Sequence, residues 1–200
     1  MKPSGTIMPA MPTATERRPC IGVVLAGGRS TRMGCDKALL DWRGRPLLER
    51  QLDALRASGV DDVRVSGDRP AYHGVADARP GLGPLAGLAA IAGATSGEAD
   101  LVVIPVDMPL LQATLLRRLR DERPPARCLC FAEHVLPMRL RLDTESRVLL
   151  AALLREGEPR GRSLRALQQA LDRAEIALAA DEAVQLTDCN TETLWHEVNR

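Results

Sequence analysis

Residues 20–37 read CIGVVLAGGRSTRMGCDK, an apolar run followed by two adjacent glycines and a group of charged side chains. The apolar run is short and rich in β-branched residues, which is typical of a buried parallel strand. Gly27 and Gly28 allow the backbone to turn sharply and to approach a ligand closely. Backbone N–H groups exposed in such a turn can bind an anion. The segment therefore predicts a strand that ends in a ligand-binding turn.

Three cationic side chains, Arg29, Arg32 and Lys37, follow the two glycines. An arginine can hold two phosphate oxygens at once, and a lysine provides a compact point charge for a phosphate group. The glycine spacing matches neither GxxxxGK[ST] nor GxGxxG, so these two phosphate-binding motifs are excluded. On residue types alone, a polar turn with solvated charges explains the segment equally well.

Strand and helix patterns alternate along the rest of the chain. Further strands are predicted within residues 61–66, 72–83, 99–107, 127–134 and 136–142, the last two as a peripheral antiparallel hairpin or extension. Helices are predicted within residues 46–59, 84–97, 114–123, 144–157 (capped near Thr144), 162–171 and 191–200. This alternation predicts an α/β fold: a three-layer sandwich with a mostly parallel sheet and helices on both faces.

The length of the chain suits one domain with a substantial core. Residues 1–18 are rich in Pro, Thr and small residues and lack an apolar segment of signal-peptide length, so we expect a disordered tail. Residues 19–200 are expected to form one domain. The five cysteines include no CxxC pair, which favours free thiols in a reducing compartment and a cytoplasmic location.

Composition argues against two classes of partner. Aromatic residues make up only 2% of the chain, so a base-stacking surface for single-stranded nucleic acid is not expected. The net charge of +1 provides no electrostatic attraction to DNA or to an anionic membrane. No apolar stretch is long enough for a membrane-spanning helix. We therefore expect small-molecule ligands rather than nucleic acid or membrane.

Ligands of parallel α/β sheets bind beyond the carboxyl ends of the strands, which directs attention to the residues there. Asp107 follows the most apolar predicted strand and suits either a Mg²⁺ ligand or a helix N-cap. Asp77 ends a short strand and suits either a ribose or base contact or a loop cap. The glycines of residues 80–87 precede a helix, where they favour either an anion contact or tight packing. Asn190 is either a cap or a residue of the same edge.

No nucleophilic triad is recognisable. The three histidines are dispersed, no GxSxG motif occurs, and none of the histidines stands beside a Ser or Cys in a recognised motif. We therefore interpret them as surface or loop residues.

The motifs together resemble those of a known family. VVLAGGRSTRMGCDKALL is similar to LAGGxSxRMGxDKxLL, the signature of the molybdenum cofactor guanylyltransferases, or MobA family, which are nucleotidyltransferases of Rossmann-like fold. The resemblance continues through GRPLLERQLDAL, DARPGLGPLAGL, VIPVDMPLL and NTETL, in the same order and spacing. It spans residues 20 to 198 approximately and implies a Rossmann-like nucleotidyltransferase domain.

The resemblance also implies a reaction, in which GMP is transferred from GTP to molybdopterin with release of pyrophosphate. The attacking terminal phosphate of molybdopterin is already ionised at neutral pH, so no general base is needed. Catalysis then consists of positioning and charge neutralisation. Transient contacts with molybdenum-cofactor donor and acceptor proteins are expected.

Site residues are implied by the same resemblance. Lys37 would bind the phosphates of GTP, Arg32 the pyrophosphate leaving group, and Asp107 both GTP and Mg²⁺. The nucleotide would also contact Leu25, Ala26, Gly27, Gly28, Ser66 and Asp77. Molybdopterin would contact Gly83, Arg162 and Asn190, although Arg162 is equally well explained as a solvated residue at a helix start.

The sequence departs from the family pattern in two places. Ser66 stands where the family commonly has an asparagine near the ribose or base. The closing motif is commonly Asn-x-Asn-Thr-Pro-Glu, whereas residues 188–192 read DCNTE, with Asp188 at the first position and no proline. Both departures concern contacts with the substrates rather than the glycine turn or the lysine.

Two other functions remain open. A sister enzyme would use CTP or make a nucleotide sugar, but the AGG sequence favours guanine because cytidylyl relatives usually have AAG. A non-catalytic nucleotide or molybdenum-cofactor carrier would not need to keep Arg32, Lys37 and Asp107 together. Catalysis with GTP is therefore the preferred interpretation.

Overall fold

The computed structural model describes residues 17–27 and 36–199. Its main sheet contains β1 (Cys20–Leu25), β4 (Asp62–Ser66), β5 (Ala99–Pro105), β6 (Cys128–Phe131), β7 (Met138–Leu142) and β8 (Arg173–Ile176). The strand order is β4-β1-β5-β7-β6-β8. Strands β4, β1 and β5 are parallel, as are β6 and β8, whereas β7 runs antiparallel to both of its neighbours. The predicted, mostly parallel sheet is confirmed.

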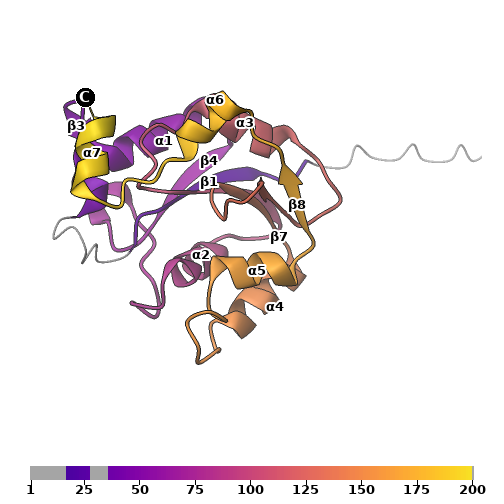
Figure 1. Cartoon of the computed structure of the whole chain (residues 1–200). Helices are drawn as coiled ribbons and strands as arrows, with labels where there is room; N and C mark the ends of the chain where they lie inside the picture. Colours follow the sequence, from indigo (N-terminus) through magenta and orange to yellow (C-terminus); the bar gives the residue numbers. More distant parts are fainter. Residues whose placement is uncertain (1–16, 28–35, 200) are drawn as a thin grey trace, which may run out of the picture.

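Helices cover both faces of this sheet, as Figure 1 shows. On one face lie α1 (Leu47–Ala57), α3 (Ala113–Asp121) and the short α6 (Ala180–Ala183). On the other lie α2 (Pro84–Gly93), α4 (Thr144–Leu153) and α5 (Leu164–Ala170). The smaller elements are the hairpin β2 (Asp41–Trp42) and β3 (Arg45–Pro46), α7 (Glu192–Val198), and the 3₁₀ helices η1 (Lys37–Leu39), η2 (Pro70–Tyr72) and η3 (Val184–Leu186). The α/β three-layer sandwich of the prediction is confirmed.

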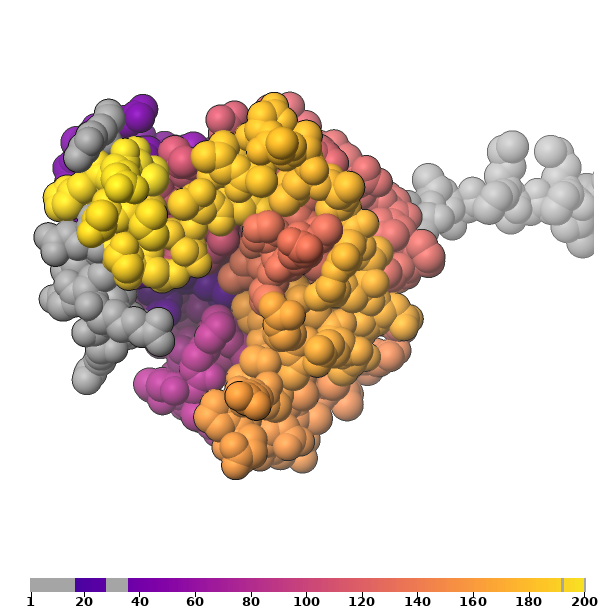
Figure 2. Space-filling model, viewed as in Figure 1, coloured from indigo at the N-terminus to yellow at the C-terminus, as the bar shows by residue number. Residues whose placement is uncertain are grey.

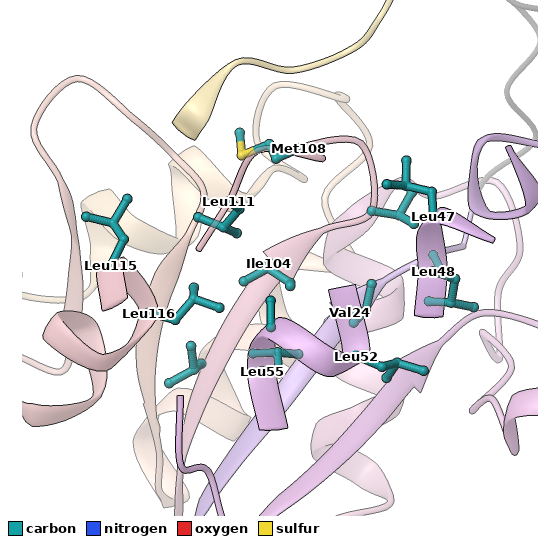
Figure 3. Packing of buried hydrophobic residues seen from close by; sticks show 14 of the residues in the cluster. Val24, Leu47, Leu48, Leu52, Leu55, Ile104, Met108, Leu111, Leu115 and Leu116 are labelled. Atoms are coloured by element: carbon teal, nitrogen blue, oxygen red, sulfur yellow. The ribbon is translucent and has the colours of Figure 1, made fainter. Parts of the chain in front are cut away.

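Helix α1 forms because its leucines fall on one face. Leu47, Leu48 and Leu55 are completely buried and Leu52 nearly so. They pack on the sheet together with Val24 of β1 and with Ile104 of β5 (Figure 3). Burial of each leucine stabilises the fold by about 1.5–3 kcal/mol. The helix ends before Gly59, whose φ of +82° is a conformation that favours glycine.

The opposite face of the sheet is covered by helices of a different composition. Leu85, Leu88 and Ile91 of α2 are completely buried and belong to a second apolar cluster, which includes Val23 and Val103 of the sheet. Apart from Pro84 at its start, the rest of α2 consists of alanines and glycines, which allow close packing on the strands. The two clusters place β1 and β5 at the centre of the molecule, where their ends are held rigidly.

Several expectations about individual elements were wrong. In residues 72–83, predicted as a short strand running into a Gly/Pro loop, the strand is reduced to a single bridge between Val75 and Ser66, because the chain leaves η2 through His73, whose φ of +50° is not an extended conformation. Strands β6 and β7 pair antiparallel as expected, but β7 lies inside the sheet rather than at its periphery, because it pairs with β5 as well. Strand β8 was not predicted, since RAEI is partly exposed and lacks an apolar run. The cap expected near Thr144 is Asp143, the residue before it, which forms a reciprocal capping box with Ser146.

Four cysteines lie within the described part of the chain, and all are free and buried: Cys20, Cys128, Cys130 and Cys189. Burial raises the pKa of Cys20 to about 11 and that of Cys128 to about 12. None of the described helices is both long and apolar enough to cross a membrane. Residues 1–16 of the predicted tail, and Cys35, lie outside the described residues.

Candidate functional site

The register of the central strands brings three segments to one edge of the sheet. Leu25 at the end of β1 lies opposite Ser66 of β4 on one side and Pro105 of β5 on the other. The residues that follow each strand therefore emerge side by side at the carboxyl edge. Figure 2 shows a hollow here, with the indigo end of the first strand between the magenta segment around α2 and the yellow C-terminal segment.

The glycines at this edge let two backbones meet directly. Ala26 N donates a hydrogen bond of 3.0 Å to Ser66 O. Gly67 has a φ of +120°, and a Cβ atom placed on it would lie 2.8 Å from both N and Cα of Gly27. Gly27 itself is exposed. The Gly27 backbone therefore packs against Gly67 on one side and remains accessible to a ligand.

Lys37 and Asp107 meet at the same edge, as the resemblance implied. The Lys37 Nζ atom lies 2.9 Å from Asp107 Oδ2 and 2.6 Å from Asn190 Oδ1. The two charged side chains are only 14% and 20% exposed, so their attraction is screened less than that of a surface pair. Lys37 begins η1, which Asp36 caps by accepting a 3.1 Å hydrogen bond from Ala38 N. The lysine is therefore presented from an ordered turn.

Arg69 was not singled out by the sequence, although it is central to this geometry. Its guanidinium binds both carboxylate oxygens of Asp36, and its Nη2 also donates 3.1 Å to Ala26 O. Pairing with Arg69 is the main cause that lowers the pKa of Asp36 below its usual range. Arg69 thus connects the end of β1 to the residue before Lys37. Its position directly after a predicted strand end was the available signal.

The carboxylate of Asp77 lies close to Gly27 and to Gly87 of α2. Its Oδ2 atom is 3.6 Å from where a Cβ on Gly27 would be, and its Oδ1 atom is 3.3 Å from that position on Gly87. Oδ1 is buried and has no hydrogen-bond partner among the described residues. Burial raises the pKa of Asp77. Since buried acceptors are rarely left unpaired, this carboxylate is suited to accept a hydrogen bond from a ligand.

Ser66, like Asp77, lies beside Gly87 of α2. It is buried, and a Cβ on Gly87 would overlap its hydroxyl oxygen. The absence of a side chain at Gly87 therefore makes room for Ser66 beside Asp77. A longer side chain at position 66 would need the same space.

The residues predicted to contact molybdopterin are less closely grouped. Gly83 is exposed, with a φ of +79°, and precedes α2 with no atom near its missing Cβ. Arg162 Nη1 donates 2.9 Å to Glu156 O within its own loop, and its Nε is buried without a partner among the described residues. Asn190 instead joins Lys37 and Asp107. The predicted roles of Gly28 and Arg32 fall outside the described residues.

The carboxylates present suit a metal that takes most of its ligands from elsewhere. Within residues 17–27 and 36–199, no group of three or more His, Cys, Asp or Glu side chains is arranged to hold a metal ion. Mg²⁺ commonly uses one or two carboxylates together with water and substrate phosphates. Asp107, beside a lysine at a strand end, fits that pattern and does not fit an all-protein cage.

Comparisons with known proteins agree with this geometry. Residues 22–174 match the model of the MobA-like NTP transferase domain. A molybdenum cofactor guanylyltransferase of Xanthomonas euvesicatoria is 50% identical over 90% of this chain and 95% of its own length. One from Pseudomonas syringae pv. tomato is 33% identical over 90% of this chain and 94% of its own.

A solved structure shares the fold. The molybdopterin-guanine dinucleotide biosynthesis protein A of Archaeoglobus fulgidus superposes with a TM-score of 0.71. It is 19% identical and covers 90% of this chain and 96% of its own. The sequence motifs, the strand-end geometry and these similarities agree, and the chain belongs to the MobA-like NTP transferase family.

Proposed function

We propose that this protein is a molybdenum cofactor guanylyltransferase, which transfers GMP from GTP to molybdopterin and releases pyrophosphate. The observation that carries the proposal is the Lys37–Asp107 pair, 2.9 Å apart, at the same sheet edge as the open Gly27 backbone. The relative that is 50% identical over 90% of the chain carries the same name. The enzyme unit is residues 19–200.

The nucleoside of GTP would lie against Leu25, Ala26 and Gly27. A missing side chain at Gly27 leaves room for the base, and the unpaired Asp77 Oδ1 would accept a hydrogen bond from the base or ribose. Ser66, buried beside Asp77, would hold that carboxylate in place rather than reach far into the pocket. These contacts would fix the nucleoside relative to the phosphate-binding residues.

The phosphates would extend towards Lys37. Its ammonium group would donate hydrogen bonds to them, while Asn190 would keep the lysine oriented. Asp107 would hold Mg²⁺, which when bound neutralises charge on the transferring phosphoryl group. Arg32 and Gly28 would complete the phosphate site. Because the acceptor is an ionised phosphate, the proposed reaction needs no general base beside Lys37 and Asp107.

Molybdopterin would approach from the side of Gly83 and Arg162, with Asn190 between the two substrates. Free, buried cysteines are consistent with the reducing cytoplasm as the location. Transient contacts with donor and acceptor proteins of the molybdenum cofactor would deliver and remove the pterin.

The test is pyrophosphate release by the purified protein with molybdopterin and either Mg-GTP or Mg-CTP. We expect release with GTP. Release with CTP but not GTP would overturn the base assignment, and no release with either would favour a carrier protein. Asp107→Asn should fold normally and lose Mg²⁺-dependent turnover, whereas Asp181→Asn, an exposed change on α6, should not alter it. Full activity of Asp107→Asn would contradict the role of Asp107.

A further inference from the structure

Helix α1 contains one polar side chain on its buried leucine face. Gln51 is completely buried. Its Nε2 atom donates 2.7 Å to Met108 O and is 3.4 Å from Val106 O. These carbonyl groups belong to the residues immediately before and after Asp107. One amide group therefore contacts the backbone on both sides of the catalytic carboxylate.

The carbonyl of Asp107 itself is held from another direction. Cys189 N donates to it at 2.8 Å, from the segment that also carries Asn190. The carbonyls of three successive residues, 106 to 108, are thus bound by groups from α1 and from the C-terminal segment. The backbone that carries Asp107 has little freedom to rotate.

The same helix holds the end of this turn. Arg50 Nη2 donates 2.8 Å to Leu111 O, and burial lowers the pKa of Arg50. The side chains of Met108 and Leu111 belong to the apolar cluster that contains Leu47, and Figure 3 shows them above Leu52 and Leu55 of α1. Residues 106–111, the Asp107 turn, are therefore attached to α1 by polar and apolar contacts.

Core packing alone does not explain a glutamine at this position. Gln51 Oε1 is buried and has no hydrogen-bond partner among the described residues. An unpaired buried amide oxygen is unfavourable, so an apolar residue would serve the packing of α1 better. Such a departure from a favourable core is expected where a residue serves a site rather than the fold.

We propose that Gln51 is a positioning residue, which holds the Asp107 turn so that the carboxylate faces Lys37 and the metal-bound phosphates. The proposal rests on the metal role of Asp107 in the proposed function. Residues that orient a metal ligand usually change metal affinity by about 10- to 100-fold when replaced. A purely structural glutamine would change stability without this effect.

The test uses Gln51→Met, which keeps the volume and helix preference but removes the amide. Gln168→Met is the matched control: Gln168 is also completely buried, donates 2.8 Å to Val135 O, and has an equally unpaired Oε1. For each protein, the Kd of a non-hydrolysable GTP analogue is measured with Mg²⁺ and with EDTA. The ratio of the Kd in EDTA to the Kd in Mg²⁺ reports how strongly metal and nucleotide binding are coupled.

We expect Gln51→Met to lower this ratio about tenfold and Gln168→Met to leave it unchanged, although both lose stability in urea. A wild-type ratio in Gln51→Met, together with a ratio lost in Asp107→Asn, would overturn the role of Gln51 and leave the proposed function intact. A wild-type ratio in Asp107→Asn would overturn both. If Gln51→Met does not fold, Gln51→Leu removes the same amide with another apolar side chain, and an unchanged ratio there would equally refute the proposal.

Discussion

Replacement of Gly67 by alanine should damage both the fold and the nucleotide site. At a φ of +120° an L side chain is strained, and the added Cβ would lie 2.8 Å from backbone atoms of Gly27. Backbone strain of this kind costs about 1–3 kcal/mol. Overpacking against atoms that cannot rotate away adds about 1–3 kcal/mol. We therefore expect the free energy of unfolding to fall by about 2–6 kcal/mol. This is a large part of the total, which for a typical domain is about 5–15 kcal/mol.

Gly97→Ala separates the two contributions. Gly97 has a φ of +69°, and no atom lies near the position of an added Cβ, so its replacement carries strain without overlap. We expect it to lose about 1–2 kcal/mol and to keep wild-type affinity for GTP. Gly67→Ala should lose more stability, and its GTP affinity should fall because Gly27 is displaced. Urea unfolding and GTP titration measure both quantities. Equal stability of the two variants, with unchanged GTP binding, would refute the close approach of the two loops.

Three further predictions concern charged residues. Lys37→Met should lower kcat for pyrophosphate release about 100- to 1,000-fold, because one donor to the developing charge is removed; near-normal turnover would contradict its role. Arg69→Met should lose stability at neutral pH, since pairing lowers the folded-state pKa of Asp36 below its ordinary 3.8. That loss should become smaller as the pH falls through the folded-state pKa, and a pH-independent difference in urea midpoint would be inconsistent with it. Asp77→Asn should be more stable than the wild type above pH 3.8, because burial raises the pKa of Asp77, and should bind GTP more weakly. Thermal unfolding with and without GTP measures both the stability of Asp77→Asn and its affinity for GTP. Unchanged or tighter GTP binding would count against Asp77 as a nucleotide contact.

Much of the fold could be predicted because its signals are local. The apolar runs of β1 and β5 and the leucine spacing of α1 depend only on neighbouring residues. Strand β8 and the placement of β7 depend on pairing between distant segments, which sequence periodicity does not record. A short, half-polar strand such as β8 becomes a strand only because β6 offers it an edge.

The same distinction applies to the site. The glycine turn, Lys37 and Asp107 could be identified from the sequence, because each follows or ends a recognisable element and the motifs resemble a family. Arg69 and Gln51 could not, because an arginine in a loop and a glutamine in a helix carry no signal of what they contact. Their roles appear only where the chain brings them to Asp36 and to the Asp107 turn.

The sequence by itself thus indicated most of the strands and helices, the family, and the charged residues for which we propose nucleotide binding. Tertiary structure alone decided which of these groups meet. The parallel register places the ends of β4, β1 and β5 level, so that residues far apart in the chain, Lys37, Asp107 and Asn190, converge on one point. The physical reason is that side-chain chemistry is a local property, whereas distances across a sheet are set by hydrogen-bond register and by the packing of helices on its faces.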